Sequence, residues 1–278
     1  MLAPDESRQN PFASKMQIPS DSLIIWTGVP VGGGASDSCW VSIGGGGKAA
    51  IGKRNNAANG NGYIVYNELV CYRLARELGL PIADGLVHVV PGQDPFFVQL
   101  NFNSAGDMPP GVDPVAFAKA QPQVAAQVVA FDIFVINTDR HAGNLTYLKR
   151  PGGEERVFVF DHSHALFGGK GHQPGPPRLT RGPNWLGCDG AIGNAHCLLP
   201  NLSDAVVLDQ ELGRIQQLPD RAIGEAVSEA RLRGLKASDC NVLRTTLLKR
   251  RDSISQDCGG ESSFFSGCRP MVSSGSLR

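Results

Sequence analysis

The chain has 278 residues, enough to bury a sizeable core as one large domain or as two lobes with a cleft between them. Lysine plus arginine and aspartate plus glutamate each number 26, so no overall field attracts nucleic acid or an acidic membrane. Seven cysteines, an odd number without a C-x-x-C pair, argue against a zinc ribbon and a complete disulfide framework.

No apolar run approaches the roughly eighteen residues of a membrane span. The first residues also lack the charged and apolar regions of a signal peptide. We therefore expect a cytoplasmic protein with no membrane span and no direct contact with nucleic acid.

Residues 1–20 are polar and contain proline and serine, which predicts a flexible tail. Residues 21–103 are expected to form an N-terminal nucleotide-binding lobe. Short apolar runs bounded by turn residues predict its strands at 23–29, 38–43, 48–53, 86–90 and 95–101. The segment that leaves the last strand, 99–103, is the expected hinge whose backbone would meet an adenine ring.

A glycine-rich loop separates the first two predicted strands. Gly33 and Gly34, with Ser36 beside them, would let backbone N–H groups approach the phosphates of a nucleotide, because no side chain keeps the ligand away. The loop at 44–47 is equally rich in glycine and is more typical of a hairpin turn. The same turn interpretation stays open for the first loop.

Residues 63–78 carry apolar side chains at helical intervals and end at Gly79 and Pro81, which predicts a helix. Lys53 ends the third predicted strand, and Glu68 lies within the helix. Kinases use this order to build an ion pair in which the glutamate holds the lysine against the α- and β-phosphates of ATP. Two ordinary surface charges would fit as well, and Lys48 competes for the lysine role because Gly52 is an unusual strand residue.

The strongest motif follows an apolar segment, 124–136, that predicts a buried helix. Asp139 and Asn144 are five residues apart, like the aspartate and asparagine of a kinase catalytic loop. Strands predicted at 145–148 and 156–160 would form a hairpin that brings Asp161 back beside Asn144. Two oxygen ligands of one hard cation require such proximity, so Asn144 and Asp161 are the candidate Mg²⁺ ligands.

Three other interpretations compete with a kinase. The polar residues of the motif could simply cap turns. Asp139 and Asp161 could instead join His141, His162 and His164 around a transition metal, as in a metal-dependent hydrolase. The chain could also be an inactive nucleotide-binding scaffold, although every catalytic residue type of a kinase is present.

Residues 104–253 are expected to form a mostly helical C-terminal catalytic lobe. Beyond a glycine- and proline-rich stretch after Gly169, apolar periodicity predicts helices at about 203–216, 221–232 and 237–250. The serine- and glycine-rich residues 254–278 are expected to be a disordered tail.

With these motifs described, the chain resembles the HipA-like kinase family, bacterial serine/threonine kinases distantly related to phosphatidylinositol kinases. The resemblance extends over about 32–169 and is strongest in 67–81, 131–144 and 160–162. It implies an α+β, two-lobed protein-kinase-like fold whose N-terminal lobe is an antiparallel sheet with one main helix. The implied activity is transfer of the ATP γ-phosphate to a hydroxyl-bearing substrate, with protein as the favoured class.

The resemblance also assigns roles to single residues. It implies that Asp139 is the catalytic base, that Asn144 and Asp161 bind Mg²⁺, and that Glu68 orients Lys53 against the phosphates of ATP. It would permit autophosphorylation at Ser36 or Ser38 in the glycine-rich loop. Two departures are that Asp161 is not followed by Phe-Gly and that the glycine-rich loop matches the family only loosely.

Overall fold

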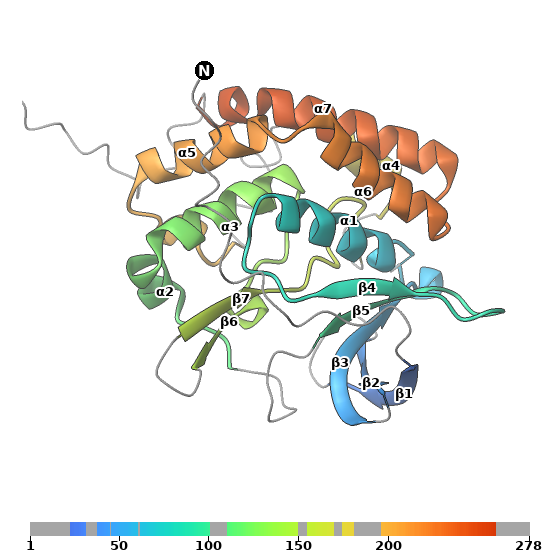
Figure 1. Ribbon diagram of the computed structural model, residues 1–278. Helices are drawn as coiled ribbons and strands as arrows, with labels where there is room; N and C mark the ends of the chain where they lie inside the picture. Colours follow the sequence, from blue (N-terminus) through green and yellow to red (C-terminus); the bar gives the residue numbers. More distant parts are fainter. Residues whose placement is uncertain are drawn as a thin grey trace, which may run out of the picture.

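The computed structural model shows a sheet at one end of the molecule and a group of helices at the other (Figure 1). It describes residues 23–31, 38–44, 46–60, 62–100, 110–149, 155–169, 174–180 and 196–259. Gly33, Gly34 and Ser36 therefore lie outside the described residues, as do the tail 1–20 and most of the predicted hinge. The arrangement confirms the predicted α+β class with an antiparallel sheet and a helical lobe.

The sheet has five strands in the order β1-β2-β3-β5-β4, and every neighbouring pair is antiparallel. The strands are β1 (Ile24–Pro30), β2 (Ser38–Ile43), β3 (Gly46–Arg54), β4 (Gly85–His88) and β5 (Phe96–Leu100). Val31 N donates to Ser38 O at 2.9 Å, which closes the base of the glycine-rich loop, and Ser38 pairs with Lys53 across β2 and β3. The loop therefore leaves the sheet beside Lys53.

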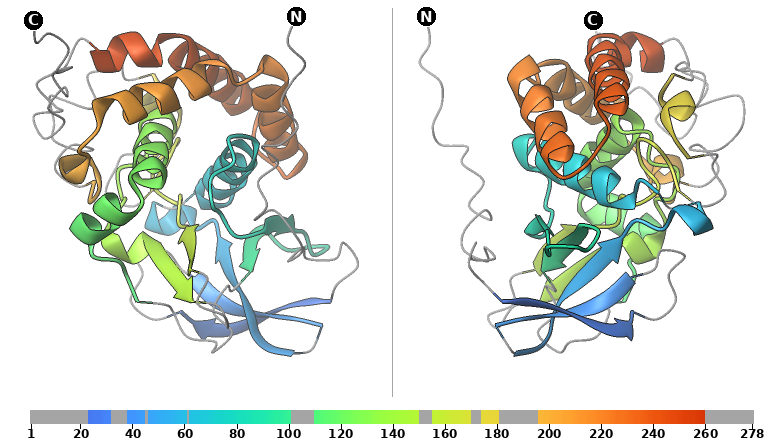
Figure 2. Two further views of the ribbon diagram at one scale, coloured as in Figure 1. Left: turned by 60° about the vertical axis from the view of Figure 1, so that its left-hand side comes forward. Right: turned by 90° about the vertical axis from the view of Figure 1, so that its right-hand side faces the viewer.

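Helix α1 (Ile64–Glu77) lies between the sheet and the helical lobe (Figure 2). Its apolar residues recur at helical spacing, and eleven of its fourteen residues are buried, so two sides of the helix are covered. Gly79, at φ +73°, ends it, and Leu80 N donates to Ala75 O at 2.9 Å across the turn. The helix agrees with the sequence prediction to within one residue at each end.

The second lobe begins with two helices that start at prolines. They are α2 (Pro114–Ala120), which the sequence analysis did not anticipate, and α3 (Pro122–Phe134). Asp113 caps α2 by accepting from the backbone N–H groups of Val115 and Ala116. The predicted hairpin follows as β6 (Leu145–Lys149) and β7 (Glu155–Val159), paired in antiparallel fashion.

The remaining helices are α4 (Pro176–Leu179), α5 (Ala205–Gln216), α6 (Asp220–Leu232) and α7 (Ala237–Gly259). The last three match the predicted helices, but α7 runs nine residues beyond the predicted end at Arg250. It also passes position 254, where the disordered tail was expected to begin. Burial of Ile254 and Cys258 in the core explains the extension, because these side chains remove apolar surface from water.

One contiguous core joins the two lobes through α1. Leu69 and Leu74 of α1 belong to the same buried cluster as Phe97 of the sheet and Phe131 of α3. A smaller cluster, built on Val41 and Phe96, fills the sheet itself. The position of α1 is therefore set from both sides, which matters because α1 carries Glu68.

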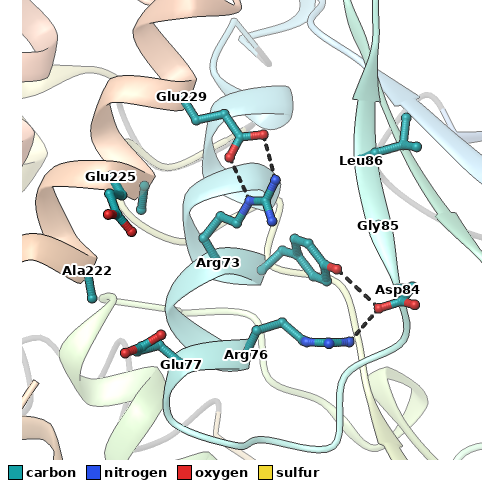
Figure 3. A pocket seen from close by; sticks show the side chains of 11 residues that line it. Arg73, Arg76, Glu77, Asp84, Gly85, Leu86, Ala222, Glu225 and Glu229 are labelled. Carbon is teal, nitrogen blue, oxygen red and sulfur yellow. Dashed lines mark hydrogen bonds and ion pairs between the residues drawn. The ribbon is translucent and has the colours of Figure 1, made fainter. Parts of the chain in front are cut away.

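A polar cavity of about 580 Å³ lies behind α1, between α1, α6 and the start of β4 (Figure 3). Arg73 donates two hydrogen bonds to Glu229 of α6, at 2.6 and 2.8 Å, and Arg76 pairs with Asp84 ahead of β4. These pairs are partly exposed, so each stabilises the fold only slightly. They orient the outer face of α1 toward α6 and β4.

Close packing explains why β3 has a glycine, Gly52, in its interior. A Cβ atom at this position would lie 2.5 Å from Val41 Cγ2 and 2.7 Å from Trp26 Cζ3. Trp26 crosses the sheet here, with its ring at 5.2 Å from that of Phe96 and the Arg54 guanidinium 4.1 Å from its centroid. The unusual strand residue is therefore a packing requirement of the sheet.

We predict that Gly52→Ala destabilises the protein by about 1–3 kcal/mol, because the added methyl group overpacks a filled position. Chemical denaturation measures the free energy of unfolding. Gly213→Ala in α5 is the matched control, since nothing lies within 4 Å of a Cβ there. The control should be neutral or stabilising by up to about 1 kcal/mol, and equal effects of the two changes would contradict the packing argument.

Candidate active site

A buried cluster of charges forms where β3, α1 and the segment after β7 meet. Lys53 Nζ lies 2.5 Å from Glu68 Oε1 and 2.8 Å from Asp161 Oδ1. The three residues are separated by up to 108 positions in the sequence, and the fold brings them into one ion-paired group. Lys53 rather than Lys48 is thus the lysine paired with Glu68, while the side chain of Lys48 lies outside the described residues.

The two residues after Asp161 complete this cluster. His162 N donates to Glu68 Oε1 at 3.2 Å, and Ser163 Oγ lies 3.0 Å from the same oxygen. Ser163 Oγ also accepts from Lys53 Nζ at 3.0 Å and lies 2.7 Å from Asp161 Oδ1. The His-Ser pair that replaces Phe-Gly therefore contacts every charged member of the cluster.

The charges of the cluster support one another. Burial disfavours the charged form of Asp161, but Lys53 and the hydrogen bonds from Ser163 outweigh it and hold the pKa of this carboxyl well below its usual range. Burial likewise disfavours the ammonium of Lys53, yet Asp161 and Glu68 raise its pKa above the ordinary value. Both groups are therefore charged at neutral pH.

The loop that carries Asp139 and Asn144 is held by a fully buried arginine, Arg140. Its Nη1 donates to Asn144 O at 3.1 Å and to Phe160 O at 2.7 Å. Phe160 N in turn donates to Asn144 O at 3.2 Å, which continues the β6–β7 pairing. The hairpin and Arg140 thus place Asn144 beside Phe160, the residue before Asp161, in keeping with the return of the chain that the sequence analysis expected of this hairpin.

Arg140 is itself positioned by Asp132 of α3. Arg140 Nε and Nη2 donate to the two oxygens of Asp132 at 2.6 and 3.1 Å, and neither side chain is exposed. His196 Nε2 lies 3.1 Å from Asp132 Oδ2, while its Nδ1 accepts from Leu198 N and Leu199 N. His196 Nε2 is consequently the protonated nitrogen and donates to Asp132.

His162 contributes an acceptor to the same network. Arg140 Nη2 lies 3.0 Å from His162 Nε2, and an arginine can only donate, so this nitrogen accepts. Burial and the nearby Arg140 lower the pKa of His162 to about 3, which keeps the ring neutral. Its Nε2 is therefore engaged by Arg140 rather than turned toward a metal.

A second buried arginine, Arg178 of α4, holds the segment after Asp161 against the segment that leads from α3 to Asp139. Its Nη1 donates to the carbonyls of three successive residues, 164–166, and its Nη2 donates to Ile136 O and Thr138 Oγ1. Three non-glycine residues here have positive φ: Ile136 at +56°, Asp161 at +60° and Leu166 at +44°. Such backbone costs about 1–3 kcal/mol per residue and persists where surrounding bonds enforce it, often at functional sites.

Asn144 and Asp161 each have one side-chain oxygen that accepts no hydrogen bond from the described residues, and these two oxygens suit a magnesium ion. Asn144 Nδ2 donates to Asp139 O at 2.9 Å, which leaves Asn144 Oδ1 as a free acceptor among the described residues. Asp161 Oδ1 accepts three bonds, whereas Oδ2 accepts none from the described residues. One carboxylate and one amide oxygen suit Mg²⁺, which binds few protein oxygens and retains water or phosphate ligands.

The histidines of the competing metal-hydrolase interpretation form no three-ligand cluster with the carboxylates in the described part of the chain. There, no group of three or more His, Cys, Asp or Glu side chains could hold a metal ion. His141 Nδ1 accepts from Gly143 N at 3.1 Å, and His164 Nε2 is 3.9 Å from Asp139 Oδ2. Transition-metal sites need three or four such ligands.

Asp139 has the exposure expected of a group that meets a substrate. Its side chain is 43% exposed, whereas the Lys53 side chain is 9% exposed. Asp139 N donates to Asn137 Oδ1 at 3.2 Å and Asn137 Nδ2 donates to Asp132 Oδ1 at 2.9 Å, so the loop backbone is fixed while the carboxylate stays accessible. It can accept a hydrogen bond from an incoming hydroxyl.

Comparison with solved structures relates this geometry to known proteins. The chain superposes on the Helicobacter pylori proinflammatory kinase CtkA with a TM-score of 0.58, covering 91% of this chain and 100% of that one at 14% sequence identity. The chain has a kinase fold. The predicted two-lobed, kinase-like architecture is thereby confirmed.

A more distant match is HipA of Shewanella oneidensis, solved with HipB and operator DNA. It has a TM-score of 0.46 and 17% identity, covering 82% of this chain and 66% of that one. No protein-family model matches the sequence, and no curated protein is similar to it. At 14% identity the likeness to CtkA concerns the fold.

The sequence analysis missed several residues that build this candidate site. Asn67, Asp132, Ser163, Arg178 and His196 act through main-chain or long-range contacts. Asn67 and Ser163 are direct neighbours of Glu68 and His162, so adjacency to a motif was their one available signal.

No helix in the described part of the chain is long and apolar enough to cross a bilayer.

We predict that Arg140→Met destabilises the protein by about 3–5 kcal/mol, because it leaves the buried carboxylate of Asp132 without its arginine and with only His196 and Asn137 as partners among the described residues. Chemical denaturation tests this. Arg221→Met removes an arginine from an exposed pair with Glu225 and should cost less than about 1 kcal/mol. A loss for Arg140→Met no larger than that of the control would show that the buried pair does not hold the loop.

Asp132 also predicts a pH dependence of stability. Burial opposes its charge, but Arg140 and His196 hold the pKa of this carboxyl well below the unfolded value of about 4. The stabilisation is present above pH 4 and is lost as pH falls from there toward the folded pKa. Asp132→Asn should therefore flatten the decline in unfolding free energy between about pH 4 and pH 2, measured by denaturation at several pH values, whereas an unchanged slope would contradict the assignment.

Proposed function

We propose that this protein is an ATP- and magnesium-dependent phosphotransferase that transfers the γ-phosphate of ATP to a hydroxyl acceptor, in the manner of HipA-like serine/threonine kinases. The observation that carries the proposal is the ion-paired group of Lys53, Glu68 and Asp161, assembled from three separate segments. Kinases place a strand lysine, a helix glutamate and a metal-binding aspartate in this way. The kinase fold supports the same conclusion.

Lys53 is proposed to contact the phosphates of ATP, with Glu68 holding its ammonium in position. Glu68 is only 2% exposed, accepts from Lys53 and His162 N, and lies 3.0 Å from Ser163 Oγ, so its carboxylate is fixed before a nucleotide arrives. Gly33, Gly34 and Ser36 are proposed to cover the phosphates, because the base of their loop lies opposite Lys53. Preorganised donors of this kind stabilise developing charge without reorganisation.

Asn144 is proposed to bind Mg²⁺ through Oδ1 and Asp161 through Oδ2, because these oxygens accept no hydrogen bond from the described residues. Bound magnesium would neutralise negative charge on the phosphates during transfer. The chain supplies the positions of these ligands through Arg140 and the hairpin. Accurate placement of reacting groups accounts for much of the rate of phosphoryl transfer.

Asp139 is proposed to accept or orient the proton of the acceptor hydroxyl. The carboxylate of Asp139 is partly exposed, while hydrogen bonds fix the neighbouring residues Asn137 and Arg140. The backbone on both sides therefore limits the positions that this carboxylate can reach. A protein hydroxyl is the favoured acceptor, and a cytoplasmic location suits use of ATP. The net charge of zero offers no general attraction to nucleic acid.

Two substitutions separate binding from chemistry. Asp139→Asn should bind Mg-ATP within about twofold of the wild type yet lose at least about 100-fold in turnover, because general-base catalysis is removed. Asp161→Asn should instead weaken Mg-ATP binding by about tenfold or more, since a charged ligand is lost. Calorimetric ATP binding and transfer of radiolabelled phosphate to proteins of a cell extract measure the two effects.

The matched control is Asp209→Asn, which changes an exposed aspartate of α5. It should leave both binding and turnover at wild-type values. Wild-type protein that neither binds Mg-ATP nor transfers phosphate would refute the proposed function. Phosphate transfer by Asp139→Asn at the wild-type rate would refute the role of Asp139.

A further inference from the structure

Ser163 differs from the other residues of the site because it contacts Lys53, Glu68 and Asp161 with a single side-chain atom. Its Oγ lies 2.7 Å from Asp161 Oδ1, 3.0 Å from Glu68 Oε1 and 3.0 Å from Lys53 Nζ. Ser163 is fully buried. An ammonium can only donate, so Oγ accepts from Lys53 and has one proton for one of the two carboxylates.

The shorter distance identifies Asp161 as the better acceptor of that proton. Ser163 N donates to the same oxygen, Asp161 Oδ1, at 3.1 Å. Serine thus supplies two of the three bonds to Oδ1, and Lys53 supplies the third at 2.8 Å. Since Oδ1 is fully engaged, Oδ2 is the oxygen of Asp161 left for a cation.

The position of Ser163 does not depend on Lys53 alone. Asn67 Nδ2 donates to Ser163 O at 2.7 Å and to Gly168 O at 3.1 Å, and Asn67 Oδ1 accepts from Phe167 N at 3.2 Å. Asn67 is fully buried in α1, next to Glu68. The turn that contains Ser163 is therefore fixed to α1 at both of its ends.

This arrangement has a consequence for the proposed nucleotide complex. When the ammonium of Lys53 turns to phosphate oxygens, Asp161 Oδ1 loses one of its three donors. The two bonds from Ser163 persist because Asn67 holds that residue in place. Without the hydroxyl, the carboxylate would keep one backbone donor and could rotate away from the geometry that a metal requires.

We propose that the Ser163 hydroxyl is a positioning group that fixes the orientation of Asp161 and thereby sets the affinity of the site for magnesium. The inference rests on the proposed function, because it assigns Asp161 as a metal ligand. It deepens that function by adding a residue that touches neither nucleotide nor metal. Hydrogen bonds to charged groups are strong enough for their loss to be measured as a change in affinity.

The test compares ATP affinity with and without magnesium, measured by isothermal titration calorimetry on the full chain. Ser163→Ala should reduce the magnesium-dependent gain in ATP affinity by about tenfold to a hundredfold, the effect of one charge-assisted hydrogen bond. Affinity for ATP without metal should stay within about twofold, because Lys53 and Glu68 are retained. In phosphate transfer, the half-saturating magnesium concentration should rise while kcat at saturating magnesium is largely kept.

Two further variants make the result specific. Thr146→Val removes another fully buried hydroxyl. Thr146 lies on β6, and its hydroxyl donates to Pro110 O at 3.0 Å, so its loss should leave the magnesium-dependent gain unchanged. Ser163→Cys keeps a weaker donor of similar size and should fall between wild type and Ser163→Ala. If Ser163→Ala is unfolded at the assay temperature, the comparison of Ser163→Cys with Thr146→Val decides the question.

A Ser163→Ala protein with the full wild-type gain from magnesium would overturn the inference, as would an equal loss in Thr146→Val. These outcomes leave the proposed function intact, since wild type would still bind Mg-ATP. Failure of the proposed function looks different, because the wild-type protein would then show no gain in ATP affinity from magnesium at all.

Discussion

The ion-paired group of Lys53, Glu68 and Asp161 is the constraint on which the rest of the structure depends. A charged group is removed from water at a cost of several kcal/mol, so each of the three residues needs the others. They come from the sheet, from the helix between the lobes and from the end of the hairpin. Satisfying these charges therefore fixes three elements of the fold relative to one another.

Two buried arginines fix the main chain around this ion-paired group. Arg140 and Arg178 are fully buried, and both donate hydrogen bonds to backbone carbonyls of the segments that carry Asp139 and Asp161. Backbone at positive φ is found between these anchors, at Ile136, Asp161 and Leu166. Irregular backbone is retained here because guanidinium groups satisfy carbonyls that a helix or a sheet would otherwise pair.

Much of the site could be predicted because its motif is local. Asp139 and Asn144 lie within one short loop, and two short apolar runs around a proline- and glycine-containing turn identified the hairpin that returns to Asp161. The strand and helix around Lys53 and Glu68 were found for the same reason, since periodicity and stop signals report on neighbouring residues. The ion pair between them was an inference from order along the chain, which the structure bears out.

The remainder could not be predicted because it depends on contacts distant in the sequence. His196 meets Asp132 from 64 positions away, and nothing local distinguishes it from the other histidines. Helix α2 is only seven residues long, too short for a periodic pattern to identify. The extension of α7 depends on the core receiving Ile254, which the polar composition of that region obscures.

The attachment of α1 to the segment after Asp161 limits how the two lobes can move. Many two-lobed enzymes open and close around their ligands by hinge motion. Here a swing of α1 away from the helical lobe would break the three hydrogen bonds of Asn67 as well as those of Glu68. Relative motion of the two lobes is therefore easier if the sheet rocks over a stationary α1, with this helix as the pivot rather than the moving part.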